Sequence, residues 1–473
     1  MPPNKTINKD LLWYFLGTIV PVFISLLKTT VFTRHYSPYE YGQYNLIFLT
    51  FNYLSLVLFA LINATTWRYY AEYRSNLGKF TTNICIMLCC SVAILTLIGT
   101  AWYMISDDLL KKDLILASTL YTISNETLAV ILIVVRLQKK AALYNFFQLL
   151  RTIGSFALVL FLVFVCNSNI SSLINSMIIF NIALLAYFLK KNTFNLIAYR
   201  YLDKKMLNQF LNYGFVGAII NLFQFLIINS DRYLIALFYS VETVGIYNQC
   251  YAIGQLFINS LVVVFINYIN PDFINILIHK PKLSDNYIKK ASISFIYLIT
   301  PFVFATVLFP YEIVTVFLGK EFREAYTVIP LVAISNYFIG ISALFELKNK
   351  FEGKLKKTVF AFVLALTVNA GLNVLVIPRF GYLSAAYTTL VAYAVLFLFN
   401  TNKRQVSLIV KKCLMPLLYA ISIILFHLVV SFIGFYNKTI VYAGIFGSLY
   451  VFCYYLLFRK NRYLAEIIKS SSY

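Results

Sequence analysis

The residues of this sequence that could do chemistry are ionisable side chains placed inside long apolar segments. They are Lys28, Glu126, Arg151, Asp231 and Arg232. A charge is costly in hydrocarbon, so such residues usually face a bundle interior or a water-filled cavity. Arg68, at the end of another apolar segment, belongs with the cations because guanidinium groups bind phosphate oxygens in a bidentate manner. We therefore take Lys28, Arg68, Arg151 and Arg232 as candidate cations for an anionic ligand.

Glu126 and Arg151 lie about equally far from the basic residues Lys139 and Lys140. An antiparallel helix hairpin would bring the two side chains to one level. One interpretation is a structural salt bridge, which needs no ligand. The other is that Glu126 holds Arg151 until a substrate or a proton intervenes. For Arg68 the alternative is an interfacial anchor beside Trp67.

These charges must be positioned by membrane-spanning helices, because 60% of the 473 residues are hydrophobic and only 12% are charged. Apolar runs of roughly 20 residues recur along the chain, and each is long enough to cross a bilayer as a helix. We predict about 14 spans. They lie near residues 11–32, 44–66, 83–105, 114–135, 143–166, 170–189, 211–238, 247–271, 291–318, 327–346, 358–377, 382–400, 411–433 and 440–458.

The basic residues test this assignment, because Lys and Arg accumulate in cytoplasmic loops. With these spans, about 30 of the 40 basic residues fall in alternate loops. Both termini are then cytoplasmic, and the net charge of +22 indicates orientation and contact with membrane lipids, not with nucleic acid. The outer loops are short and carry no catalytic motif, so we expect no enzyme. The scattered His and Cys residues predict no metal site.

The two halves of the chain contain an internal repeat. The segment from Tyr36 to Asn45 matches the segment from Tyr239 to Asn248 at Tyr, Ser, Gly, Tyr and Asn. The offset covers six helices, so the repeats share one orientation. We predict an amino-terminal lobe of six helices (1–190), a cytoplasmic linker (191–210), a second six-helix lobe (211–400), and two further helices with a basic tail (401–473).

The same offset places Lys28 and Asp231 at equivalent positions, near the predicted outer side. Opposite charges then face a pseudo-symmetry axis. We hypothesise that they meet when an outer gate is shut and separate when it opens. The alternative is that each charge pairs within its own lobe, with Arg232 as the local partner of Asp231.

Three motifs carry a resemblance to a known family. They are Tyr41-Gly-Gln-Tyr44, Asp231-Arg232 leading to Val244-Gly-Ile-Tyr247, and Glu352-Gly-Lys354 followed by Asn369, Asn373 and Ile377-Pro-Arg-Phe-Gly381. The chain resembles polysaccharide flippases of the Wzx type, in the superfamily of multidrug, oligosaccharidyl-lipid and polysaccharide exporters. The resemblance covers most of the chain, but after about Lys411 it is one of hydropathy only.

The resemblance implies two lobes rocking around a central cavity, as in multidrug exporters of this superfamily. The implied activity carries an oligosaccharide on undecaprenyl diphosphate from the cytoplasmic to the periplasmic leaflet of the inner membrane, for O-antigen or capsule synthesis. The sugars and the diphosphate need a polar path, whereas the polyprenyl tail can stay in lipid. No cofactor is implied. A proton or a sodium gradient is the expected drive, and the polymerase and chain-length machinery are potential partners.

Two alternatives remain open from the sequence. One is another exporter of the same fold, for lipid II or for drugs. The other is a polytopic polysaccharide polymerase or glycosyltransferase, which would need catalytic groups on the outer face.

Overall fold

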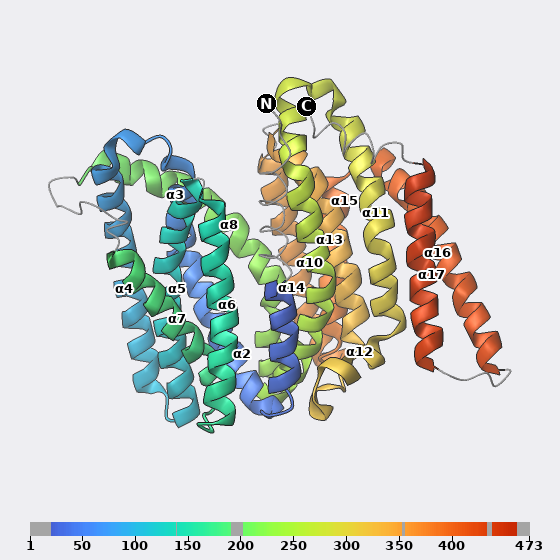
Figure 1. The fold of residues 1–473 in the computed structure, drawn as a ribbon, viewed down its shortest axis with the longest axis horizontal. Coiled ribbons are helices and arrows are strands. Elements are labelled where there is room, and N and C mark those ends of the chain that lie inside the picture. The colour runs from blue at the N-terminus through green and yellow to red at the C-terminus, as the bar shows by residue number, and fades with distance from the viewer. Residues whose placement is uncertain (1–19, 139, 191–201, 352–354, 433–437, 461–473) are drawn as a thin grey trace. The chain divides into compact units, whose positions relative to one another are not determined.

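The computed structural model describes residues 20–138, 140–190, 202–351, 355–432 and 438–460, and its regular elements there are helices (Figure 1). No β-strand occurs within these ranges. The expected all-α class is confirmed. Some sequence features lie outside the described residues: the amino-terminal segment with Lys5 and Lys9, residues 191–201 of the predicted linker, Lys139, the loop from Glu352 to Lys354, and the basic tail.

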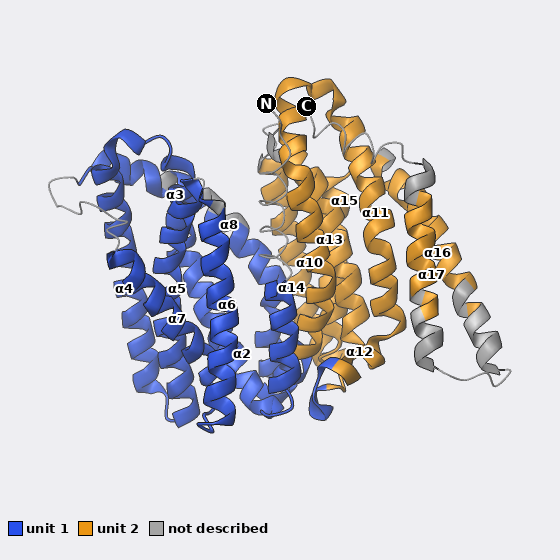
Figure 2. Cartoon of the chain, viewed as in Figure 1, with its two compact units in different colours: residues 1–248, 317–322 blue, residues 249–316, 323–473 orange. Residues whose placement is uncertain are grey.

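The chain divides by packing into two compact units (Figure 2). Unit 1 comprises Met1–Asn248 and Phe317–Phe322, and unit 2 comprises Gln249–Val316 and Arg323–Tyr473. The predicted lobes follow the repeat and not this division, so they stay a prediction.

The helices of unit 1 pack mainly around α5. It contacts α2, α3, α4, α6 and α7, while α3 also packs on α8. The helices are Val20–Phe32, α2 (Pro38–Leu58), α3 (Ala60–Tyr69), α4 (Leu77–Ile105), α5 (Leu109–Leu137), α6 (Ala141–Phe164), α7 (Ser172–Lys190), α8 (Lys204–Asn229), α9 (Asp231–Phe238) and the start of α10 (Val241–His279), with the short η1 (Arg74–Asn76) and η4 (Lys320–Phe322).

In unit 2, α11 and α15 each contact several neighbours: α11 packs on α13, α16 and α17, and α15 packs on α13 and α14. The helices are the remainder of α10, η3 (Pro281–Leu283), α11 (Ser284–Leu308), α12 (Pro310–Phe317), α13 (Val328–Phe351), α14 (Leu355–Phe380), α15 (Ser384–Asn400), α16 (Lys403–Phe432) and α17 (Lys438–Lys460).

Among the described residues, nine helices are long and apolar enough to cross a bilayer, or ten if α2 and α3 form one span. Every predicted span overlaps a described helix. The chain is therefore a multi-pass membrane protein, and the total of about 14 spans stays a prediction.

The start of α2 is fixed by its own sequence. Ser37 and Glu40 form a reciprocal capping box, in which Ser37 N–H donates to Glu40 Oε2 at 2.8 Å and Glu40 N–H donates to Ser37 Oγ at 3.3 Å. Twenty residues later the helix bends by 43° into α3. Ser91 Oγ donates to the Leu58 carbonyl at this bend (2.8 Å), so the buried break is partly satisfied by α4.

The first turn of α8 is capped by Asp203, whose Oδ1 accepts from the backbone N–H groups of Met206 (3.2 Å) and Lys205 (3.1 Å). The bond from Met206 is the main reason that the pKa of Asp203 lies below its ordinary value, and the charge of Lys79 at 3.6 Å adds to this effect. A lowered carboxyl pKa stabilises the fold at neutral pH, and this contribution is lost as the pH falls through the folded-state pKa.

Gly381 ends α14 in the left-handed region, with φ of 91°. Its N–H donates to the Ile377 carbonyl (3.1 Å), and its carbonyl accepts from Ser384 N–H (3.1 Å) at the start of α15. This glycine belongs to the Ile377-Pro-Arg-Phe-Gly381 motif. The motif therefore encodes a tight turn between α14 and α15, which only a residue without Cβ enters without strain.

A Gly381→Ala variant is expected to lose about 1–2 kcal/mol of stability, because Cβ meets the backbone when φ is positive. Thermal unfolding of the purified protein in detergent measures this loss. Gly371→Ala in the same helix is the matched control, since a Cβ there meets nothing within 4 Å. Equal unfolding temperatures for the two variants would contradict the assignment of a strained turn.

Candidate functional site in unit 1

Asp231 and Arg232 form a fully buried ion pair at the start of α9. Asp231 Oδ1 lies 2.5 Å from Arg232 Nη1, and the two side chains are 0% and 2% exposed. Two residues of α10 complete the pair. Tyr247 Oη donates to Asp231 Oδ2 at 2.7 Å, and Arg232 Nε donates to Asn248 Oδ1 at 3.1 Å.

Two further contacts of Arg232 are also close in sequence. Arg232 Nη1 donates to the carbonyl of Ile228 on α8, and its guanidinium carbon lies 5.4 Å from the Tyr247 ring centroid. These partners all belong to α8, α9 and the start of α10. Asp231 thus has the local partner that the sequence offered as the alternative to Lys28, and a meeting of Lys28 with Asp231 in another conformation stays a prediction.

Glu126 and Arg151 come to one level, as the hairpin geometry predicts, but Asn125 stands between them. Arg151 Nη1 on α6 donates to Asn125 Oδ1 on α5 at 3.0 Å. The amide nitrogen of Asn125 in turn donates to Glu126 Oε1 at 3.1 Å. The second carboxylate oxygen accepts from Asn63 Nδ2 on α3 at 3.0 Å. A polar chain therefore runs from α6 through α5 to α3.

Lys28 adds a second cation beside Arg151. The charges of Lys28 and Arg151 act on each other, and both side chains are half-buried. Neither forms an ion pair within the described part of the chain. Lys28 and Arg151, two cations in apolar segments, are thus accompanied by the carboxylate of Glu126, which reaches Arg151 through the Asn125 amide.

Arg68 lies apart from these groups in its contacts. It is exposed near the end of α3, and its guanidinium carbon is 5.6 Å from the ring centroid of Tyr69. Nearby, Arg136 lies over Trp67 at 5.1 Å. This arrangement matches the interfacial anchor at least as well as a phosphate site, and the binding role of Arg68 stays a prediction.

The structure adds polar residues that the sequence reasoning did not assign to the site: Asn125, Tyr247 and Asn248. Two of them carried a usable signal, because Tyr247-Asn248 is the repeat copy of Tyr44-Asn45. In the first copy, the amide nitrogen of Asn45 is buried without a hydrogen-bond partner among the described residues. The two copies therefore share residue types but not bonding.

The asparagines of α14 hold helices together. Asn369 and Asn373 are 0% exposed, and Asn373 Nδ2 donates to Asn369 Oδ1 at 3.1 Å. Thr388 on α15 donates to Asn373 Oδ1. Interhelical hydrogen bonding therefore accounts for Asn373, whereas the amide nitrogen of Asn369 is buried without a hydrogen-bond partner among the described residues.

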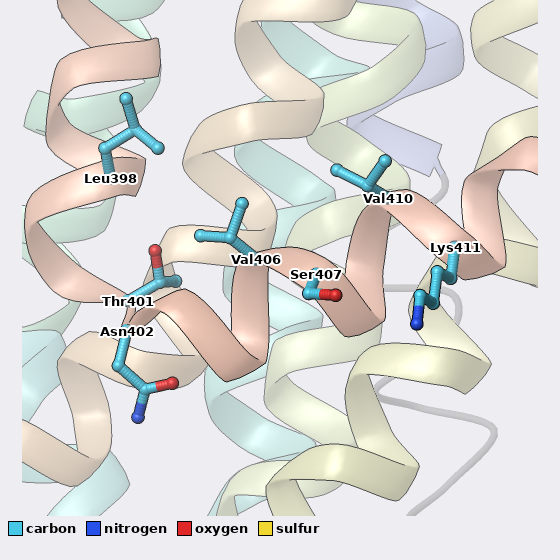
Figure 3. A pocket seen from close by; sticks show the side chains of 7 residues that line it. All are labelled: Leu398, Thr401, Asn402, Val406, Ser407, Val410 and Lys411. Carbon is cyan, nitrogen blue, oxygen red and sulfur yellow. The ribbon is translucent and has the colours of Figure 1, made fainter.

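A cavity of about 730 Å³ lies along the end of α15 and the start of α16 (Figure 3). It is lined by Leu398, Thr401, Asn402, Val406, Ser407, Val410 and Lys411. None of the predicted binding or gating residues lines it. Within the described ranges, no group of three or more His, Cys, Asp and Glu side chains is placed to hold a metal ion.

Comparison with known families finds a matching family model. The sequence model of polysaccharide biosynthesis proteins matches residues 7–271. No curated protein matches the chain.

Solved structures resemble the fold over most of its length. A lipid II flippase, MurJ, in an inward closed conformation has a TM-score of 0.69 at 16% identity, and the alignment covers 95% of this chain and 98% of that one. An inward-facing multidrug resistance transporter of the MATE family and MOP superfamily has a TM-score of 0.62 at 12% identity, covering 84% and 98%. A Vibrio cholerae MATE transporter has a TM-score of 0.56 at 14% identity, covering 83% and 96%. The expected MATE-like fold is confirmed. These proteins are named as a flippase and as transporters, and none is named as an enzyme.

Proposed function

Since the chain belongs to the polysaccharide biosynthesis protein family, we propose that it carries undecaprenyl diphosphate-linked oligosaccharide repeat units across the inner membrane. The units move from the cytoplasmic to the periplasmic leaflet and serve O-antigen or capsule synthesis. The fold of a lipid II flippase supports a lipid-linked glycan as the class of substrate.

The observation that carries this proposal is the excess of positive charge in unit 1. Among the described residues neither Lys28 nor Arg151 forms an ion pair, and of these two cations Glu126 reaches only Arg151, through Asn125. The buried pair of Asp231 and Arg232 adds no net charge. An unneutralised cation inside a membrane is costly. A diphosphate bound by Lys28 and Arg151 removes that cost while the substrate crosses.

Unpartnered polar atoms in unit 1 supply hydrogen bonds for sugars. Among the described residues, Asn45 Nδ2, Tyr53 Oη and Asn63 Oδ1 are buried without partners. A buried polar group without a partner costs about 1–3 kcal/mol, so each gains when a sugar hydroxyl reaches it. Asn63 also holds Glu126, so a sugar at Asn63 would act on the chain of polar contacts that ends at Arg151.

The mechanism follows from the chemistry of the substrate. The head group passes through a polar cavity that opens to one side at a time, and the polyprenyl tail remains in lipid. A proton or a sodium gradient drives the cycle. In this proposal both termini are cytoplasmic, and the polymerase and chain-length machinery receive the product.

Reconstitution tests the proposal. Proteoliposomes containing the purified protein and a defined undecaprenyl diphosphate oligosaccharide should deliver the glycan to the opposite leaflet, where an added glycosidase can cut it. Proton and sodium gradients are varied separately. Movement of lipid II alone would favour the second candidate function, a lipid II flippase. The structural likeness to MurJ is the observation that supports this candidate. Movement of no polyprenyl-linked glycan would overturn the assignment.

A Glu126→Gln variant tests whether protonation of Glu126 releases Arg151. The amide keeps the shape of the side chain but has no carboxylate, so the variant is expected to transport with a flattened pH dependence. Initial rates in the same proteoliposomes, measured over a series of pH values, report this change. An unchanged pH profile would remove the proton role.

A further inference from the structure

The two copies of the internal repeat lie directly against each other within unit 1. A Cβ atom on Gly42 of α2 would be 1.9 Å from the carbonyl oxygen of Val241, the first residue of α10. A Cβ atom on Gly245 of α10 would be 2.0 Å from the carbonyl oxygen of Pro38, the first residue of α2. Each glycine therefore packs on the first turn of the opposite helix.

These contacts are reciprocal under the repeat. The offset that aligns Gly42 with Gly245 also aligns Pro38 with Val241. Pro38 contacts Gly245, and its repeat equivalent Val241 contacts Gly42, the repeat equivalent of Gly245. Such a reciprocal pair of contacts is the signature of a two-fold axis. The start of α2 and the start of α10 thus form a pseudo-symmetric seam, defined by Pro38, Gly42, Val241 and Gly245.

A third glycine makes a similar contact beside this seam. A Cβ on Gly319 would be 2.0 Å from the Thr33 carbonyl oxygen, and Gly319 N–H donates to Thr33 Oγ1 at 3.0 Å. Three residues later, the Phe322 ring meets the Tyr41 ring edge-on, with centroids 5.3 Å apart. The residue before Gly42 is thereby held in a buried aromatic contact.

We propose that the seam is the closed outer gate of the transporter, and that Gly42 and Gly245 are the positioning residues that let it shut. This rests on the alternating-access function proposed above. Small residues allow helix backbones to approach closely in a membrane. Here they bring carbonyl oxygens against Cα atoms on both sides of one axis, so the closed state needs no large side chain to fill the gap.

Parting of the seam leaves the described hydrogen bonds of the buried ion pair in place, because they join Asp231 and Arg232 to α8 and α10. The contacts that α2 must give up include those of Tyr53, whose ring lies 4.8 Å from that of Phe225 on α8 and 5.9 Å from that of Tyr233 on α9, centroid to centroid. A hydrogen bond of 2.7 Å between Thr50 and Tyr233 joins α2 to α9, and it is exposed. Water can replace such a bond when the helices separate.

Alanine in place of either glycine is expected to favour the open state of the seam over the closed state. The carbon-to-oxygen distance in a close contact is about 3.3 Å or more, so a Cβ at 1.9 Å forces the backbones about 1.4 Å apart. Overpacking of this kind disfavours the closed seam by about tenfold or more in the ratio of closed to open molecules. Gly42→Ala and Gly245→Ala are therefore expected to hold the gate open.

The experiment measures labelling of a cysteine next to the seam. Asn45→Cys, three residues after Gly42 on the same face of α2, is introduced into a variant without the seven native cysteines. A membrane-impermeant maleimide is applied to right-side-out vesicles without substrate. Gly42→Ala and Gly245→Ala should each raise the labelling rate about tenfold or more. Gly371→Ala, whose Cβ meets nothing within 4 Å, should leave it unchanged.

Two results would overturn the proposal. One is a labelling rate in both seam variants equal to that of Gly371→Ala. The other is failure of both seam variants to accumulate in the membrane while Gly371→Ala accumulates, because the seam is then a permanent part of the fold. If only one of the two seam variants fails to accumulate in the membrane, the labelling rate of the other decides, because it introduces a Cβ atom into the same seam from the opposite helix. Faster labelling, together with no transport of any glycan by the protein that retains Asn45, would keep the gate and overturn the proposed function instead.

Discussion

Replacing Arg151 with glutamine is expected to lower transport of the diphosphate-linked substrate by at least about thirtyfold, because truncating one partner of a buried charged contact costs about 2–5 kcal/mol. Within the described part of the chain, Arg151 uses only its bond to Asn125, so most of its five N–H donors are available to phosphate oxygens. The initial rate of glycan movement in proteoliposomes measures the loss.

The controls for Arg151 distinguish charge from geometry. Arg151→Lys keeps the charge but not the planar fork, so its rate should lie between those of the parent and Arg151→Gln. Arg74→Gln removes an exposed arginine and should leave the rate within about twofold, the range of a surface charge. A rate for Arg151→Gln as high as that of Arg74→Gln would mean that Arg151 does not contact the substrate.

Replacing Asp231 with alanine is expected to destabilise the protein by about 3–5 kcal/mol, because Arg232 would remain as a buried charge without its carboxylate. Arg232 is 2% exposed, and its Nη1 donates to Asp231 Oδ1. The midpoint of thermal unfolding in detergent and the amount of protein in the membrane both report the loss.

A double variant provides the matched control. Asp231→Leu with Arg232→Met removes both charges and keeps apolar volume, so much of the stability should return. A double variant no more stable than Asp231→Ala would show that packing at α9, and not the unpaired charge, causes the loss.

Exchanging the charges as Lys28→Asp with Asp231→Lys tests the hypothesis that Lys28 meets Asp231 when the outer gate is shut. Restored transport supports a meeting of these two residues, and no restoration favours the local pair of Asp231 with Arg232.

The helical, membrane-spanning fold could be predicted because hydropathy is a property of segments and tolerates errors of several residues. The predicted span 83–105 lies within α4, and the predicted span 358–377 lies within α14. The positions at which helices bend were harder to predict from the sequence. The span predicted at 44–66 is two helices bent by 43° at Phe59, where neither proline nor glycine marks the bend. The bend depends on contacts such as that of Ser91 with the Leu58 carbonyl, which come from another helix.

The sequence by itself showed which charges fall in apolar segments and that the segment around Gly42 repeats around Gly245. Composition and spacing carry this information, because both act along the chain. Only the tertiary structure decided that Asp231 bonds to Arg232 and Tyr247, that Asn125 separates Glu126 from Arg151, and that the two repeated glycines touch opposite helices. A hydrogen bond depends on differences of a few tenths of an ångström, and these are set by how each helix is rotated and packed.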